Sequence, residues 1–142
     1  MPNITTKTEQ ETRLLARKLG SAFKGGEIVA LRGNLGSGKT TFVKGLARAL
    51  GVKHKIQSPT FVICQVYPAK TQLKFYHFDL YRLKSAAEFR ELGITEILRN
   101  RHNVVAVEWP GKLGKLLPTR TIYIEFKHDK KYSNLRHITI RD

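Results

Sequence analysis

The sequence predicts a single α/β domain over residues 1–142, with a mixed, largely parallel central sheet and antiparallel strands at one side. Short apolar runs, typical of buried strands, alternate along the chain with segments of helical periodicity. One of the strand-to-helix transitions passes through a glycine-rich loop at 33–38. A chain of 142 residues fits one domain and is long enough to bury a sizeable core.

The first part of the chain predicts a helix, a strand and a second helix. Thr8-Glu9-Gln10-Glu11 is a capping box that begins a helix, and Gly25-Gly26 is expected to end it. Residues 27–31 are apolar enough for a short buried strand. After the glycine-rich loop, the helical pattern resumes from Thr41 to Leu50.

The second part predicts two strand pairs and two short helices. Residues 61–67 and 73–78 are apolar and indicate a hairpin, and 121–126 with 135–141 alternate as a closing antiparallel pair. A second capping box at 85–88 begins a helix that ends near Gly93, and another helix follows to Arg99. The entirely apolar run 104–107 indicates a central strand.

The glycine-rich loop has the composition of a phosphate-binding P-loop. Glycines allow a tight wrap with inward N–H groups, and the following helix turns its positive end to the anion. Lys39 is placed to reach the β- and γ-phosphates, and the Thr40 hydroxyl to ligate Mg²⁺. The chain is therefore expected to adopt a P-loop NTPase-like sandwich. ATP is the expected nucleotide because the sequence contains no Asn-Lys-x-Asp, which would select guanine. The predicted nucleotide-binding residues are Gly33, Asn34, Leu35, Gly36, Ser37, Gly38, Lys39, Thr40 and Thr41.

Two carboxylates follow apolar strands where an α/β sheet presents functional groups. The sequence has no acidic residue from Ile28 to Phe78, so the candidates for Mg²⁺ and water chemistry begin at Asp79. Asp79 and Glu108 each end an apolar run, as in a Walker-B strand. The alternative for either is a helix-capping or ion-paired surface acid.

Three further residues are ambiguous from the sequence alone. Thr60 follows Pro59 in a stiffened loop, where its hydroxyl could sense the γ-phosphate or Mg²⁺, or simply form a turn. Trp109, beside Glu108, is interpreted by itself as a packing residue. His77 lies in a strand-like apolar run and is interpreted as structural rather than as a ligand.

The composition points to a cytoplasmic protein with a polyanionic partner. The 26 Lys and Arg against 11 acids give a net charge of +15, which favours nucleic acid; a solvated basic surface in a protein with protein partners is the alternative. The single Cys64 excludes an internal disulfide and fits a reducing compartment. No signal peptide or membrane span is expected, and hence no membrane partner.

Taken together, the motifs resemble the bacterial TsaE family, the ATPase of tRNA threonylcarbamoyladenosine biosynthesis. The likeness covers nearly the whole chain and rests on residues 33–41, 58–61, 77–83, 92–93 and 107–110. It implies a P-loop fold that binds ATP and Mg²⁺. It also implies work with the partner proteins TsaB and TsaD, which modify adenosine 37 of tRNAs reading ANN codons, with tRNA contacted directly or through that complex.

The resemblance also implies site residues, position by position. Lys39 and Thr40 match the family's phosphate and Mg²⁺ residues, and Glu108 matches its Mg²⁺-linked glutamate. Asp79, Thr60 and Trp109 match positions that the family uses at the active site. The chain departs from the family pattern where Ser85-Ala86-Ala87-Glu88 replaces a frequent Asp-Pro-Glu-Glu, and at Asn34 and Ser37, where Asp and Ala are common.

Two rival functions use the same features differently. A small-molecule kinase would need an acceptor pocket and an arginine-bearing lid, for which only Arg82 and Arg90 are in reach. An RNA-binding module with an inactive loop would use the charge alone. For the ATPase, turnover is expected to be slow in isolation and faster with partners, because no glutamine or lid stands out to complete the site.

Overall fold

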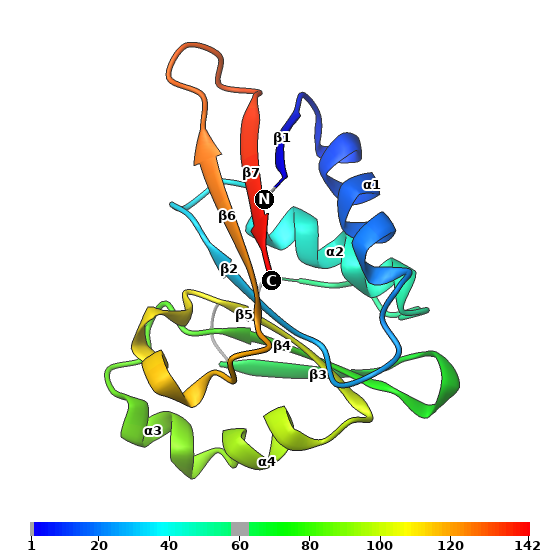
Figure 1. Ribbon diagram of the computed structural model, residues 1–142, viewed down its shortest axis with the longest axis vertical. Helices are drawn as coiled ribbons and strands as arrows, with labels where there is room; N and C mark the ends of the chain where they lie inside the picture. Colours follow the sequence, from blue (N-terminus) through cyan, green and yellow to red (C-terminus); the bar gives the residue numbers. More distant parts are fainter. Residues whose placement is uncertain (1, 58–62) are drawn as a thin grey trace.

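The computed structural model describes residues 2–57 and 63–142, and it contains a seven-stranded sheet with helices on both faces (Figure 1). The strands are β1 (Asn3–Thr6), β2 (Ile28–Arg32), β3 (Cys64–Pro68), β4 (Lys74–Asp79), β5 (Asn103–Glu108), β6 (Ile122–His128) and β7 (Arg136–Arg141). The α-helices are α1 (Glu9–Gly20), α2 (Lys39–Ala49), α3 (Ala86–Glu91) and α4 (Ile94–Arg99). Short 3-10 turns lie at η1 (Lys70–Gln72), η2 (Pro110–Lys112) and η3 (Gly114–Leu116).

The strand order is β1-β7-β6-β2-β5-β4-β3. The four inner strands β6, β2, β5 and β4 are parallel to one another, whereas β3 at one edge and β7 with β1 at the other pair antiparallel. The predicted α/β class, the β3–β4 hairpin and the closing β6–β7 pair are confirmed. The antiparallel strands lie at both edges of the sheet, where one side was expected.

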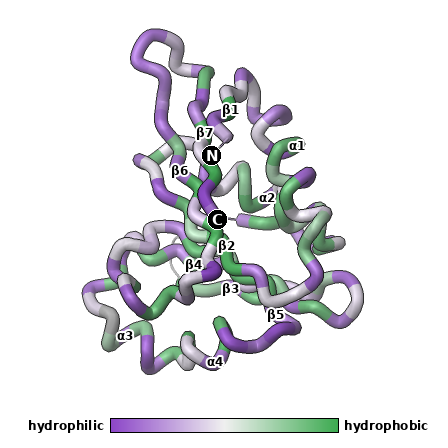
Figure 2. Tube along the Cα trace, viewed as in Figure 1, coloured by the Kyte–Doolittle hydropathy of each residue, from purple (hydrophilic) through white to green (hydrophobic). Residues whose placement is uncertain are grey.

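Alternation along the strands gives the sheet two apolar faces. In β2, Val29 and Leu31 belong to the core under α1 and α2, and Ile28 and Ala30 to the core under α3 and α4. Every residue of β5 is buried, as the apolar run 104–107 predicts. Figure 2 shows the apolar chain of β2 at the centre of the molecule and the polar loop between β6 and β7 at its periphery.

Both predicted capping boxes are present. The Thr8 hydroxyl accepts from the Glu11 N–H at 3.1 Å, and Ser85 accepts from the Glu88 N–H at 3.5 Å. The predicted end of α1 at Gly25-Gly26 is wrong: the helix ends at Gly20, after which the N–H groups of Ala22 and Phe23 donate to carbonyls three residues back, at 3.3 and 3.1 Å. Strand β1 was not predicted, because this short polar segment becomes a strand only by pairing with β7. Among the described residues, none of the helices combines the length and apolar character needed to cross a bilayer.

Helices α1 and α2 lie unusually close to each other at Gly45. A Cβ atom added there would lie 2.4 Å from the Arg13 carbonyl oxygen and 2.6 Å from the Ala16 Cβ. The missing side chain therefore sets the distance between the two helices, and with it the position of the N-terminus of α2 over the sheet.

We predict that Gly45→Ala destabilises the protein. Overpacking against backbone costs up to about 3 kcal/mol, of which the better helix propensity of alanine returns about 1 kcal/mol, leaving a net loss of about 2 kcal/mol. Urea denaturation measures this loss. Gly111→Ala is the matched control: an added Cβ there meets no atom within 4 Å, so a change within about 0.5 kcal/mol is expected. A Gly45→Ala variant as stable as the wild type would contradict the close approach.

Candidate functional site

The loop between β2 and α2 is held open by its glycines. Gly33, Gly36 and Gly38 have φ angles of +153°, +74° and +107°, values that residues with a Cβ rarely adopt. At Gly33 a Cβ would also lie 2.6 Å from the Ser37 Oγ and 2.9 Å from the Phe126 carbonyl oxygen. Gly38 precedes α2 as its N-cap and brings no side chain to cap it, so the first N–H groups of the helix can serve an anion.

A cavity of about 400 Å³ lies over this loop and the N-terminus of α2. Five parts of the chain meet there: the start of α1, the glycine-rich loop with the start of α2, the end of β4, the end of β5, and the start of β7. Of the predicted site residues, the cavity brings together Leu35, Gly36, Ser37, Gly38, Lys39, Thr40, Thr41, Asp79, Glu108 and Trp109.

Three predicted residues are not part of this set. Gly33 and Asn34 line a different hollow of about 440 Å³. Trp109 lines both this hollow and the main cavity. Thr60, with the whole predicted segment Ser58-Pro59-Thr60-Phe61, lies outside the described residues. Its role stays a prediction.

Lys39 is a buried cation, with 5% of its surface exposed. Its Nζ donates to the carbonyls of Gly33 and Asn34, the second at 3.2 Å, and lies 3.9 Å from the centroid of the Trp109 ring. Burial lowers the pKa of Lys39, an effect that the carboxylates of Glu108 and Asp79 partly oppose. A poorly hydrated cation attracts a phosphate oxygen more strongly than an exposed lysine would.

Glu108 joins α2 to the two strands beneath it. The Thr40 hydroxyl lies 3.3 Å from both carboxylate oxygens of Glu108, to which it donates, and the Nε2 of His77 donates to Oε2 at 2.5 Å. Glu108 is 3% exposed and His77 is fully buried. The other ring nitrogen of His77, Nδ1, has no hydrogen-bond partner among residues 2–57 and 63–142. A buried carboxylate is thus held from two sides.

The parallel register explains why these side chains meet. Asp79 pairs with Glu108 across β4 and β5, and Leu31 pairs with Glu108 across β2 and β5. The carboxyl ends of three parallel strands therefore reach the edge from which the glycine-rich loop departs. His77, two residues before Asp79, projects to the same face of β4. The two-residue spacing indicates only that His77 and Asp79 share a face of β4; the contact of His77 with Glu108 depends on the pairing of β4 with β5.

Asp79 is half-buried beside Glu108. Its Oδ1 accepts from the Tyr81 N–H at 3.1 Å. Burial raises the pKa of Asp79, and the charge of Glu108 adds to this, although the Tyr81 N–H, His77 and Lys39 oppose it. Two carboxylates in one partly buried site thus have different environments, a situation common where carboxylates take part in chemistry.

Trp109 has a strained backbone at the wall of the cavity. Its φ and ψ angles, 59° and 57°, place a bulky residue in the left-handed region, at a cost of about 1–3 kcal/mol. Its N–H donates to the Leu31 carbonyl at 3.3 Å, and its ring lies 4.9 Å from that of Tyr81. The packing interpretation is therefore only partly correct, because the ring also covers Lys39.

Arg136 is a site residue that the sequence analysis missed. Its guanidinium donates to the Gly36 carbonyl at 3.3 Å and to the Leu135 carbonyl at 3.2 Å, and it lines the cavity. Neither Arg82 nor Arg90, the arginines considered from the sequence, lines it. Since β7 runs antiparallel to β6, its first residue returns to the edge where the parallel strands end. Only the topology could have indicated Arg136.

We predict a strong energetic coupling between His77 and Glu108. Removing one partner of a buried charged pair costs about 3–5 kcal/mol, since the other is left unpaired. Urea denaturation of His77→Ala, Glu108→Ala and the double variant should give a coupling of about 1–3 kcal/mol. His102→Ala, at an exposed histidine, should change stability by less than about 0.5 kcal/mol. Additive losses in the cycle would show that the two side chains do not support each other.

Comparison with known proteins agrees with this site. The family model described as "Threonylcarbamoyl adenosine biosynthesis protein TsaE" matches residues 6–138. The TsaE protein of Treponema pallidum is 36% identical over 122 residues, 86% of this chain and 88% of that protein. The TsaE protein of Borreliella burgdorferi is 43% identical over 98 residues, 69% of this chain and 70% of that protein.

A solved structure shows the same architecture. The crystal structure of YdiB from Bacillus subtilis superposes with a TM-score of 0.73 at 30% identity, covering 98% of this chain and 83% of that one. The family match spans the glycine-rich loop, Asp79, Glu108, Trp109 and Arg136. The chain belongs to the TsaE family of tRNA threonylcarbamoyladenosine biosynthesis proteins.

Proposed function

We propose that this chain binds ATP with Mg²⁺ over the loop between β2 and α2 and hydrolyses it. This activity would serve the threonylcarbamoylation of adenosine 37 in tRNAs reading ANN codons, together with TsaB and TsaD. The observation that carries the proposal is the contact between Thr40 and Glu108 beside Lys39, inside one cavity. Because tRNA modification and a lone Cys64 both fit a reducing interior, a cytoplasmic location is part of the proposal.

The phosphates would be bound by backbone, helix and cations together. The glycine φ angles allow the loop to wrap an anion at the N-terminus of α2. Lys39 would exchange its contacts with two loop carbonyls for contacts with phosphate oxygens, and Trp109 would continue to cover its ammonium. Arg136, which donates to the Gly36 carbonyl, is positioned to add a second positive charge.

The donor set beside the loop fits Mg²⁺. Thr40 and Glu108 offer a hydroxyl and a carboxylate, the hard oxygen ligands that this ion prefers. Mg²⁺ usually takes only one or two protein ligands beside phosphates and water, and the described residues contain no cluster of three or more His, Cys, Asp and Glu that could hold a metal. When bound, the ion would neutralise charge on the phosphate oxygens.

Two carboxylates would divide the remaining work. Glu108 is fixed between Thr40 and His77, so its orientation does not depend on the nucleotide. Asp79 is half-buried at the same cavity, and this burial raises its pKa. Its carboxylate can accept a hydrogen bond from the attacking water. Binding and hydrolysis would thus rest on different side chains.

Lys39→Ala should therefore abolish most nucleotide binding, whereas Glu108→Gln and Asp79→Asn should slow hydrolysis more than they weaken binding. Calorimetric titration with ATP and Mg²⁺, beside a phosphate-release assay, separates the two effects. Lys18→Ala, at an exposed lysine in the last turn of α1, is the control and should match the wild type in both assays. Unchanged ATP affinity in a folded Lys39→Ala protein would contradict the assigned phosphate site.

Turnover should be slow in the isolated chain and rise when TsaB and TsaD bind. Sites of this class are often completed by residues supplied in trans. Binding to the pair should depend on the nucleotide, since a ligand shifts association only through different affinities for two states. Phosphate release with and without the TsaB–TsaD pair, together with binding in ATP-like and ADP states, measures both effects. Fast hydrolysis that the pair does not change would indicate a self-sufficient enzyme instead.

A further inference from the structure

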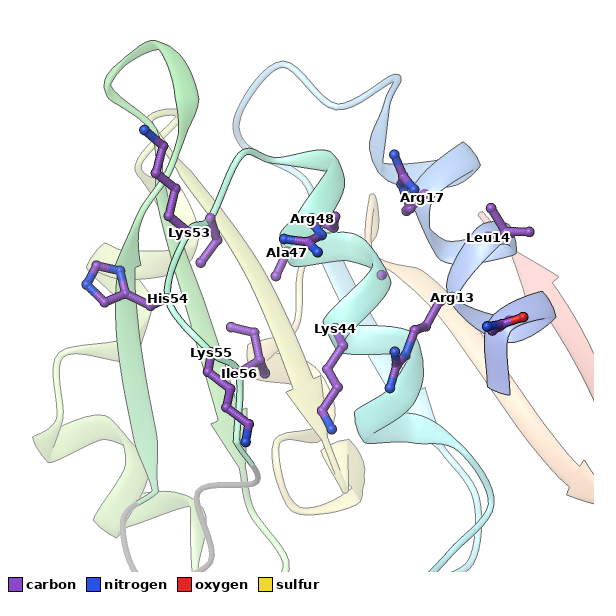
Figure 3. Close-up of a pocket in the computed structure, with 13 residues that line it drawn as sticks. Arg13, Leu14, Arg17, Lys44, Ala47, Arg48, Lys53, His54, Lys55 and Ile56 are labelled. Atoms are coloured by element: carbon purple, nitrogen blue, oxygen red, sulfur yellow. The ribbon is translucent and has the colours of Figure 1, made fainter. Parts of the chain in front are cut away.

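A basic groove of about 630 Å³ lies between α1, α2 and the segment 52–56 (Figure 3). Its lining includes six Lys and Arg side chains, one histidine and no carboxylate. The cations are Arg13, Arg17, Lys44, Arg48, Lys53 and Lys55, with His54 beside them. We call this set of side chains the α1–α2 groove.

The positive charge of the groove is almost uncompensated. Arg13 pairs with Glu9 at 3.8 Å, and Glu9 is 77% exposed, which makes the pair weak. Within residues 2–57 and 63–142, the other five cations form no ion pair. Four of them, Lys44, Arg48, Lys53 and Lys55, have no acid near them in the sequence, which contains none from Ile28 to Phe78. Like charges held together in this way repel one another and favour a polyanion.

The cations form rows on three walls. Arg13 and Arg17 lie four residues apart on one face of α1, and Lys44 and Arg48 do the same on α2. Four residues advance about 6 Å along a helix axis, a spacing comparable to that of neighbouring phosphates in a nucleic acid strand. Lys53 and Lys55 come from the extended segment on the far wall (Figure 3).

The composition of the groove favours RNA over an acidic protein surface. Protein interfaces are enriched in arginine but depleted in lysine, and they centre on buried aromatic anchors. This lining has three arginines, three lysines and no Phe, Tyr or Trp. Long cationic side chains beside buried apolar residues, such as Ala47 and Ile56, instead suit a sugar-phosphate backbone.

We propose that the α1–α2 groove binds the phosphate backbone of tRNA directly. The choice of tRNA as the RNA rests on the proposed function, whereas the affinity for RNA phosphates does not. The groove shares no lining residue with the nucleotide cavity, although both lie on α1 and α2. The chain therefore presents an RNA surface and a nucleotide site on the same pair of helices.

The test is the salt dependence of tRNA binding, which is measured by fluorescence anisotropy with an unmodified tRNA transcript. The groove variant combines Arg17→Gln, Arg48→Gln and Lys53→Gln, one exposed cation from each wall. The control combines Lys18→Gln, Arg99→Gln and Lys130→Gln, which are exposed, remove the same charge and lie outside the groove. The groove variant should reduce the log–log salt slope by about 2–3, while the control should leave it close to wild type.

Two further readouts separate the possible failures. Phosphate release without RNA should be unchanged in the groove variant, because none of its residues lines the nucleotide cavity. Transcripts with different anticodons should bind alike, since backbone contacts carry no sequence information.

An unchanged salt slope, or an equal loss in the control, would overturn the proposal. So would intact tRNA binding with lost binding to TsaB–TsaD, which would identify a protein-docking surface. If TsaB–TsaD failed to stimulate hydrolysis while the slope still fell, only the proposed function would be refuted.

Discussion

The structure depends on one buried carboxylate that must be paired. Glu108 ends a strand whose every residue is buried, and it is stable there only because Thr40 and His77 both donate to it. Those two donors come from the start of α2 and from β4, so the pairing of a single charge fixes a helix terminus over two parallel strands. The glycine-rich loop, which bridges β2 and α2, takes its shape between these fixed ends.

The same place also carries three groups with perturbed pKa values or a strained backbone. Lys39 is a buried cation whose pKa is lowered by desolvation, Asp79 is a carboxyl whose pKa is raised by it, and Trp109 holds a left-handed backbone. Each would be less costly elsewhere in the fold, and all three line one cavity. Perturbed groups gathered in this way are typical of sites that act on a ligand. Six further basic side chains lie apart from them, in the α1–α2 groove.

Local signals predicted much of this arrangement, and tertiary contacts explain what they missed. The glycines, Lys39 and Thr40 are contiguous, and Asp79 and Glu108 each end an apolar run, so periodicity and spacing were enough to find them. The contact of His77 with Glu108 and the reach of Arg136 to Gly36 depend on which strands are neighbours, which no short segment encodes. The α1–α2 groove could not be predicted for the same reason. The net charge was its only sign in the sequence, and the close approach of α1 and α2 at Gly45 brings its walls together.

The most direct test of the central claim is to locate a metal–nucleotide complex on the protein by NMR spectroscopy. Paramagnetic Mn²⁺ in place of Mg²⁺, added with ADP, broadens the resonances of nearby groups. Broadening is expected at residues 36–41 and at the ends of β4 and β5, around Asp79 and Glu108, with the α1–α2 groove unaffected. Replacing Glu108 with Gln should weaken the effect without moving it. Broadening centred on the groove, or none at residues 36–41, would contradict the assignment of Thr40 and Glu108 to a nucleotide-bound cation.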